Sequence, residues 1–439
     1  MLRQNNFVIA SPHKYAVYLP AVNTTYPKII DTTPPTTRQW PAGLTLDDLA
    51  FWSGNSQLFN HLVLLHSIGG YKIGSDPRGI LFRKQPGEYI TVGDCGGFQI
   101  GKGTLKGLKG LRVGMSGDSA VAAWGRNYEA KMWIINWLEQ YCDYAMTIDM
   151  PLWATAPVGI NSPFHKCSTQ QLIDMTVANL QLIDRERQWR TKWLNVVQGT
   201  NEANTLLWWN AVKWFKGGGW SLAGAAGWRG GLVNVLKTLL IMREEGAFSK
   251  GQNWLHMLGV SQPLWDIVLS AIQRQLRKEN PRIQVSFDSA SAFESAGARD
   301  QYAIPPKLGM KTRDWTISYK TFTALRSDAD KSKSTRTDLK SPIAKLLRMR
   351  DMVVVDKALA GRRIDQYTNA FLMNHNVYVY LEAGRRANAL AFEAKTPSIP
   401  KDFQRVLAVI EEAFMVKDWR KCISNNSFFL NTIAKSSYD

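Results

Sequence analysis

The feature that most constrains the fold is an alternation between short apolar runs and helical stretches from residue 51 to residue 300. The runs have the β-branched and aromatic composition of buried strands, and apolar residues in the stretches recur at helical spacing. Repeated units of this kind require a parallel sheet covered by helices. The strands predicted in this way are 61–68, 89–93, 144–150, 193–199, 220–224, 254–260 and 283–288.

Helices are predicted between these strands, with Ser168 and Ser261 as N-caps of two of them. Seven strand-like runs, with an eighth at 14–19 in the N-terminal part, would close a (β/α)8 TIM-like barrel of about 250 residues. A doubly wound open sheet is the alternative, but no GxGxxG follows an early strand to favour it. The predicted helices are 124–141, 168–189, 202–215, 231–245 and 263–277.

Composition divides the chain into three parts. Residues 1–50 include a Thr/Pro-rich stretch, 31–37, and are expected to form an N-terminal arm ahead of the barrel domain at 51–300. Residues 301–439 carry 24 Lys and Arg against 14 Asp and Glu and read as mainly helical, most clearly at 404–414. We predict a basic C-terminal region that binds nucleic acid.

The charge of the whole chain favours the same kind of partner. With 54 Lys and Arg against 36 Asp and Glu, the formal net charge is +18, which favours nucleic acid ahead of an anionic membrane. No apolar run is long enough to span a bilayer and the N-terminus lacks a signal-peptide core, so we expect a cytoplasmic protein with no membrane partner. The four cysteines are scattered without metal-ligand spacing, so neither a metal nor a disulfide framework is expected.

Polar residues end several of the predicted strands. In a parallel barrel the C-terminal ends of the strands share one face, where active sites are built. Carboxylates crowded at such a place cost stability unless a ligand or a mechanism uses them. The strand-end residues that we expect to converge are Asp94, Asp149, Gln198 with Gly199, Gly224 and Asp288.

At these positions the sequence resembles the tRNA-guanine transglycosylase superfamily, whose motif Asp-Ser-Gly-Gly-(Phe/Tyr)-Gln appears here from Asp94 to Gln99 with Cys95 in place of Ser. Blocks that match the family follow in the family's order over roughly residues 90–290. These blocks are Ile148-Asp149, Val197-Gln198-Gly199, Gly219 to Gly224, Leu258-Gly259-Val260 and Phe287-Asp288.

The resemblance implies exchange of a guanine base at a glycosidic bond without strand cleavage. Asp288 would match the nucleophile that attacks the sugar C1′ and forms a covalent glycosyl-enzyme, and Asp94 the general acid/base. Asp149 would hold the N1/N2 edge of the purine. Independent chemistry agrees, because a carboxylate nucleophile divides one hard displacement into two easier ones.

The resemblance also implies a pocket for the base, which the target nucleotide must enter by leaving its stack. Gln198 and the backbone region of Gly224 would bind the O6 side of the purine, and Gly199 would belong to the same substrate-binding site. Phe98 would stack on one face, and Leu258 would cover the other, where the family commonly has Met. Cys95 is expected to be a packed substitute for Ser, and a nucleophilic thiol is the sharper alternative. No cofactor is expected.

The resemblance departs from the tRNA-modifying members after the nucleophile. Those members carry a Cys/His zinc subdomain, whereas residues 289–439 contain only Cys422 and His375. We therefore expect the DNA-modifying branch, the DpdA-type DNA-guanine transglycosylases of phages and bacteria, which insert a 7-deazaguanine such as 7-cyano-7-deazaguanine into DNA. The alternatives are the same chemistry on tRNA and a non-catalytic nucleic-acid-binding paralogue.

A cluster of cations at the centre of the most basic stretch is the expected DNA contact. Residues 301–350 carry 12 Lys and Arg against 4 Asp and Glu, and Lys331, Lys333 and Arg336 lie together there. Aromatic and basic residues alternate around Trp315 and Tyr319, which suits a surface that follows phosphates.

Overall fold

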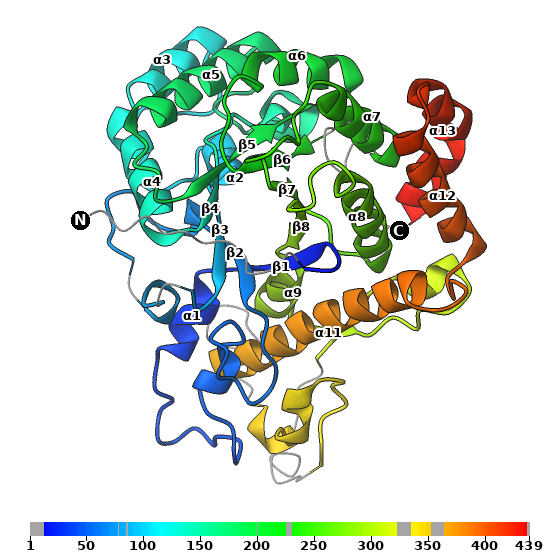
Figure 1. The fold of residues 1–439 in the computed structure, drawn as a ribbon. Coiled ribbons are helices and arrows are strands. Elements are labelled where there is room, and N and C mark those ends of the chain that lie inside the picture. The colour runs from blue at the N-terminus through cyan, green and yellow to red at the C-terminus, as the bar shows by residue number, and fades with distance from the viewer. Residues whose placement is uncertain are drawn as a thin grey trace.

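A computed structural model of the chain describes residues 13–77, 79–84, 87–199, 201–224, 231–322, 335–352 and 364–436. Eight parallel strands form a closed barrel in the order of the sequence, β1 to β8, with β1 pairing with both β2 and β8 (Figure 1). This confirms the predicted (β/α)8 barrel. The strands are β1 (Val17–Val22), β2 (Val63–Ser67), β3 (Ile90–Asp94), β4 (Tyr144–Met146), β5 (Lys192–Val197), β6 (Gly219–Leu222), β7 (Trp254–Met257) and β8 (Gln284–Ser289).

Helices surround the barrel as an outer layer, and the C-terminal helices pack along one side of this layer (Figure 1). Those of the barrel are α1 (Thr25–Ile30), α2 (Gly97–Lys102), α3 (Gly117–Gly125), α4 (Tyr128–Tyr141), α5 (Thr169–Glu186), α6 (Glu202–Val212), α7 (Gly231–Glu244), α8 (Pro263–Leu276) and α9 (Ser291–Arg299). The C-terminal part contains the hairpin of β9 (Gln301–Ile304) and β10 (Ser318–Thr321) and the helices α11 (Gln366–Phe392), α12 (Lys401–Met415) and α13 (Trp419–Ser436).

One predicted helix is divided in two, and one predicted N-cap is wrong. The predicted helix 124–141 is divided into α3 and α4. Asn127 at the break makes no side-chain hydrogen bond that caps α4, and its amide donates to the carbonyl of Lys109. Ser168 caps α5 through a capping box, as predicted. Ser261 does not cap α8: its hydroxyl pairs with Tyr380, and the N-cap residue is Gln262.

The core has two layers. Apolar side chains that point into the barrel, such as Leu19, Val92, Leu194 and Trp254, form one cluster. A much larger cluster fills the space between the strands and the helices. It also includes buried residues of α11, α12 and α13, so the C-terminal helices share the hydrophobic core of the barrel. The barrel also takes its first strand, β1, from the segment expected to be an N-terminal arm, because Val17 and Leu19 complete the inner cluster.

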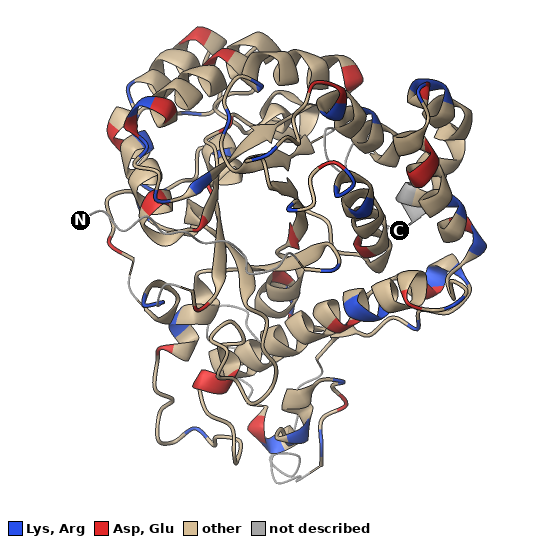
Figure 2. Cartoon of the chain, viewed as in Figure 1, with Lys and Arg blue, Asp and Glu red and all other residues tan. Residues whose placement is uncertain are grey.

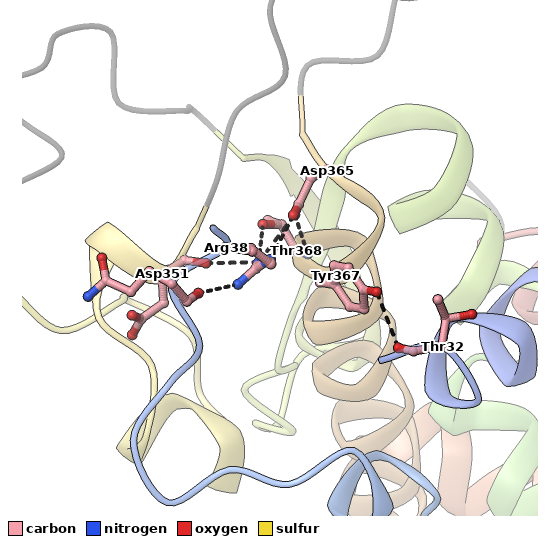
Figure 3. Close-up of polar contacts among 7 residues, drawn as sticks. Thr32, Arg38, Asp351, Asp365, Tyr367 and Thr368 are labelled. Atoms are coloured by element: carbon pink, nitrogen blue, oxygen red, sulfur yellow. Dashed lines mark hydrogen bonds and ion pairs between the residues drawn. The ribbon is translucent and has the colours of Figure 1, made fainter. Parts of the chain in front are cut away.

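A buried ion pair joins the N-terminal segment to the C-terminal region (Figure 3). The guanidinium of Arg38 donates to both carboxylate oxygens of Asp365, at 2.7 and 3.2 Å, and to the carbonyl of Asp351 at 3.1 Å. Asp365 is also the N-cap of α11 and accepts from the backbone N–H of Thr368. The hydroxyl of Tyr367 donates to the carbonyl of Thr32. Loss of either partner of this desolvated, bidentate ion pair would leave the other charge buried and unpaired, which costs free energy. These contacts therefore hold the start of α11 against the N-terminal segment.

Within the described residues, no helix is both long enough and apolar enough to cross a membrane.

Candidate active site

The C-terminal end of β3 places the first carboxylate. Asp94 is the last residue of β3, directly across from Ser67 at the end of β2. The Ser67 hydroxyl donates to Asp94 Oδ2 at 2.6 Å. Burial raises the pKa of Asp94, and the negative charge of Asp288 raises it further, although the hydrogen bond from Ser67 opposes both. Asp94 and Asp288 therefore lie close enough to influence one another, and Asp94 holds a proton more readily than an exposed aspartate.

The second carboxylate follows β4 and is buried. Asp149 is 6% exposed, and each of its oxygens accepts a side-chain hydrogen bond. Gln198 Nε2 donates to Oδ2 at 2.5 Å, and the Cys95 thiol donates to Oδ1 at 3.6 Å. The three side chains come from the ends of β4, β5 and β3, which are neighbouring parallel strands of the barrel.

Electrostatics link Asp149 to the first carboxylate. Burial raises the pKa of Asp149 to about 6, and the charge of Asp94 contributes, while the amide of Gln198 opposes the shift. Burial and the two neighbouring carboxylates also hold the pKa of the Cys95 thiol well above its usual value. Cys95 is therefore a neutral hydrogen-bond donor in this site, which agrees with the prediction of a packed substitute for Ser.

The third carboxylate belongs to β8 and has partners of a different kind. Asp288 is 8% exposed, and its Oδ1 accepts from the backbone N–H of Gly259 at 3.0 Å. The same oxygen lies 3.2 Å from Nε2 of His256, whose side chain is fully buried. Both hydrogen bonds that the described residues make with this carboxylate therefore go to Oδ1.

A chain of hydrogen bonds continues behind Asp288 through His256. Trp254 Nε1 donates to Ser286 Oγ at 2.7 Å, and Ser286 Oγ lies 2.8 Å from His256 Nδ1. Because an ionised carboxylate can only accept, Nε2 must carry a proton, and Nδ1 can then accept from the Ser286 hydroxyl. The imidazole then donates to Asp288 Oδ1, whereas the other tautomer would direct a lone pair at the carboxylate. The protein thereby orients Asp288 from beneath.

Sequence reasoning missed His256, although the strand pattern contained a signal for it. Successive side chains of a strand point to opposite faces, so residues two apart share a face. Trp254 points into the barrel, and His256, two residues later, must do the same one layer nearer to the mouth. Ser286 and Asp288 repeat this relation on β8. The sequence therefore contained a clue: a histidine in the inward register of one strand, next to the strand that carries the predicted nucleophile.

Glycines allow the backbone to approach these groups. Gly96 has φ +76°, and a Cβ there would lie 3.1 Å from the Cα of Gly69. Gly224 has φ +59°, and a Cβ there would lie 2.7 Å from the carbonyl oxygen of Gly199 and 3.1 Å from Oε1 of Gln198. The predicted cluster of Gln198, Gly199 and Gly224 is therefore brought together, with room only for glycine at its third member.

The two residues expected to sandwich the base lie on different parts of the barrel mouth. Phe98 in α2 is 51% exposed, and its ring lies beside Trp153, 5.3 Å between centroids, with Lys102 Nζ 4.3 Å above it. Leu258 follows β7, is half-buried and packs against the cluster inside the barrel. Each leaves an apolar side chain in contact with solvent at the strand ends.

Of the three C-terminal residues predicted to contact DNA, the structure describes only Arg336. Lys331 and Lys333 lie outside the described residues. Arg336 is exposed and forms an isolated β-bridge with Arg348. Basic and acidic residues occur together along α11 and α12, whereas α13 has basic residues and no acidic one (Figure 2).

The two residues of the C-terminal part that could have been zinc ligands have other roles. Both ring nitrogens of His375 are engaged, Nδ1 with the hydroxyl of Ser341 and Nε2 with the carbonyl of Ala303. Cys422 is buried in α13. Across the described ranges, no three His, Cys, Asp or Glu side chains form a group that could hold a metal ion.

No protein-family model matches the chain, and no curated protein matches it.

Proposed function

We propose that this chain is a DNA-guanine transglycosylase that exchanges guanine in DNA for a 7-deazaguanine base. The observation that carries the proposal is the convergence of Asp94, Asp149 and Asp288 at one end of a closed barrel, where each perturbs a neighbour. Three carboxylates in a largely buried site are expensive unless chemistry uses them. Their order in the chain and the residues beside them match the motif blocks of the transglycosylase superfamily.

The first step breaks the bond to guanine. Asp288 Oδ2 attacks C1′ of the target nucleotide, because Oδ1 is occupied by His256 and Gly259. An O–C1′ bond forms as the C1′–N9 bond breaks, and the electron pair leaves with guanine. Asp94, whose pKa is raised, donates the proton that the leaving base requires. The product is an aspartyl–glycosyl intermediate with an inverted C1′.

The second step reverses the first with another base. The 7-deazaguanine transfers its N9 proton to the Asp94 carboxylate as N9 attacks C1′. The N9–C1′ bond forms, the O–C1′ bond breaks, and Asp288 recovers its charge. Two inversions retain the configuration of the sugar, and Asp94 returns to its protonated form.

Recognition of the base falls to the half of the site around Asp149. The N1–H and N2–H groups of guanine and 7-deazaguanine are donors and need an acceptor. A carboxylate oxygen can accept more than one hydrogen bond, so Asp149 can receive both while Gln198 still donates to Oδ2. The amide of Gln198 and the backbone at Gly224 lie together on the neighbouring strand ends, where they can contact O6.

A base-exchange assay tests the proposal. DNA and tRNA, each labelled in guanine, are incubated with the purified protein and unlabelled 7-cyano-7-deazaguanine, and the digested nucleosides are read by mass spectrometry. We expect loss of label and a new deazaguanine nucleoside in DNA alone. Exchange in tRNA alone would replace DNA with tRNA as the substrate. No exchange in either, with the folded protein, would overturn the proposed activity.

A further inference from the structure

A repeated dipeptide occupies the connection between β3 and α3. A lysine precedes a glycine at 102–103, 106–107 and 109–110, and Arg112 lies two residues before Gly114. We call residues 102–114 the basic loop. From residue 95 to residue 117 the chain has four cations and no acidic residue. The loop begins eight residues after Asp94, so it lies on the barrel face that carries the candidate active site.

The basic loop is anchored to the barrel although it lacks regular structure over most of its length. Leu105 is buried, and Leu108 and Leu111 pack against the main core from partly buried positions. Asn127 holds the backbone of Lys109 on both sides, because its Oδ1 accepts from the N–H and its Nδ2 donates to the carbonyl, each at 2.9 Å. The carbonyl of Lys106 accepts from the N–H of Ile73 at 2.8 Å.

Anchoring in this pattern presents the cations to solvent. Each leucine that packs inward is followed directly by a cation, and all four cations are exposed: Lys102, Lys106, Lys109 and Arg112. The neighbouring acidic side chains compensate this charge weakly. Glu129 approaches Lys109 at 3.8 Å with both side chains more than four-fifths exposed, and Asp118 accepts from Gln171. An exposed pair of this kind contributes little free energy, so a polyanion can displace it.

We propose that the basic loop binds the phosphate backbone of DNA beside the target nucleotide. Regularly spaced lysines on a surface with little opposing charge neutralise successive phosphates. The exposed ring of Phe98 lies between Asp94 and Lys102 in the sequence and gives a base a surface on which to stack. The proposal rests on the proposed function for the identity of the polymer. It assigns the DNA contact to a loop of the barrel in addition to the C-terminal region.

Two variants of equal charge test the basic loop. In the first, Lys102, Lys106 and Arg112 are changed to Gln; in the second, Lys250, Lys278 and Arg282 are changed to Gln. The second set is also exposed, but it precedes β7 and β8 and therefore lies at the opposite end of the barrel. Affinity for a fluorescent DNA oligonucleotide is measured by anisotropy from low to high salt. A Lys102→Arg, Lys106→Arg variant keeps the charge.

We expect the first variant to bind DNA about 10-fold or more weakly at low salt, with a slope of log affinity against log salt reduced by roughly 2 to 3. The second and the arginine variants should bind as the parent does. Equal losses in both glutamine variants would show a general charge effect and overturn the proposal, as would no loss in the first. If DNA binding depends on the basic loop but the parent protein exchanges no base, the proposed function is refuted and the loop remains assigned as a DNA contact.

Discussion

The two halves of the candidate active site hold their carboxylates in different ways. Around Asp149, each oxygen accepts from a different side chain, the amide of Gln198 or the thiol of Cys95. Around Asp288, one oxygen accepts both hydrogen bonds, from His256 and from the backbone of Gly259. The first arrangement suits a group that receives hydrogen bonds from a base. The second leaves an oxygen for bond formation, so in the proposed activity one barrel mouth would separate recognition of the base from reaction.

The partners also differ in rigidity. Gln198 and Cys95 come from loops at strand ends, whereas His256 is fixed inside the barrel by Ser286 and Trp254. An oriented carboxylate loses little freedom on reaching the transition state, which favours its use as a nucleophile.

Removal of the charge of Asp288 should have the largest effect. Asp288→Asn keeps the shape but removes the nucleophile, so we expect base exchange to fall on the order of 10⁴-fold or more. Asp300→Asn is the matched control, because Asp300 lies outside the site with φ +52°, a conformation that Asn tolerates. Label release from guanine-labelled DNA measures both. Substantial exchange by Asp288→Asn would refute the assigned nucleophile.

Loss of the imidazole should slow the reaction without preventing binding. His256→Phe removes a hydrogen bond to Asp288, and such a bond to a charged group contributes about 1.5–3 kcal/mol, so kcat should fall about 10- to 100-fold with KM nearly unchanged. His256→Gln can still donate to Asp288 and should recover part of the rate. If both variants raise KM and leave kcat intact, His256 belongs to the recognition half instead.

The pKa of Asp149 predicts a dependence of stability on pH. Its folded value of about 6 lies above the unfolded value of about 4, so the folded state binds more protons between these pH values and stability falls as pH rises through that range. Asp149→Asn removes this cost. We expect the free energy of unfolding of the variant, measured relative to the parent, to be up to roughly 3 kcal/mol higher at pH 8 than at pH 4.

Denaturant unfolding at several pH values measures this gain, and base-exchange kinetics provide the second readout. The same variant should bind 7-deazaguanine poorly, because one acceptor oxygen is lost. A stability difference that does not change with pH would mean that Asp149 keeps an ordinary pKa in the folded protein.

Substitution of Cys95, whose thiol donates to Asp149, should have the smallest effect on base exchange. Cys95→Ser replaces one neutral donor to Asp149 with another, so we expect exchange to change only a few-fold. Because burial and nearby carboxylates raise the pKa of the Cys95 thiol, it should also resist alkylation by iodoacetamide at pH 8 in the folded parent protein. Mass spectrometry locates any modified cysteine. Loss of exchange in Cys95→Ser would favour the nucleophilic thiol.

The periodicity of the sequence determined the barrel and the order of its strands, although several strands, such as β4 and β7, end earlier than predicted. Apolar runs that alternate with helical spacing leave few other ways to bury a core, so Asp94, Asp149 and Asp288 could be placed on one face before their contacts were known. Short motifs supplied the candidates around them, including Cys95 and Gln198. These assignments depend on local patterns and on one rule of topology.

Only the tertiary structure decided what each group touches. The register of β7 against β8 aligns His256 with Ser286, and two hydrogen bonds between side chains on different strands follow from it. Closure of the barrel through β1 and the burial of α11 likewise depend on contacts between distant segments, such as Arg38 with Asp365. Hydrogen bonds and pKa shifts depend on distances of a few ångströms, and a linear pattern does not specify distances between segments hundreds of residues apart.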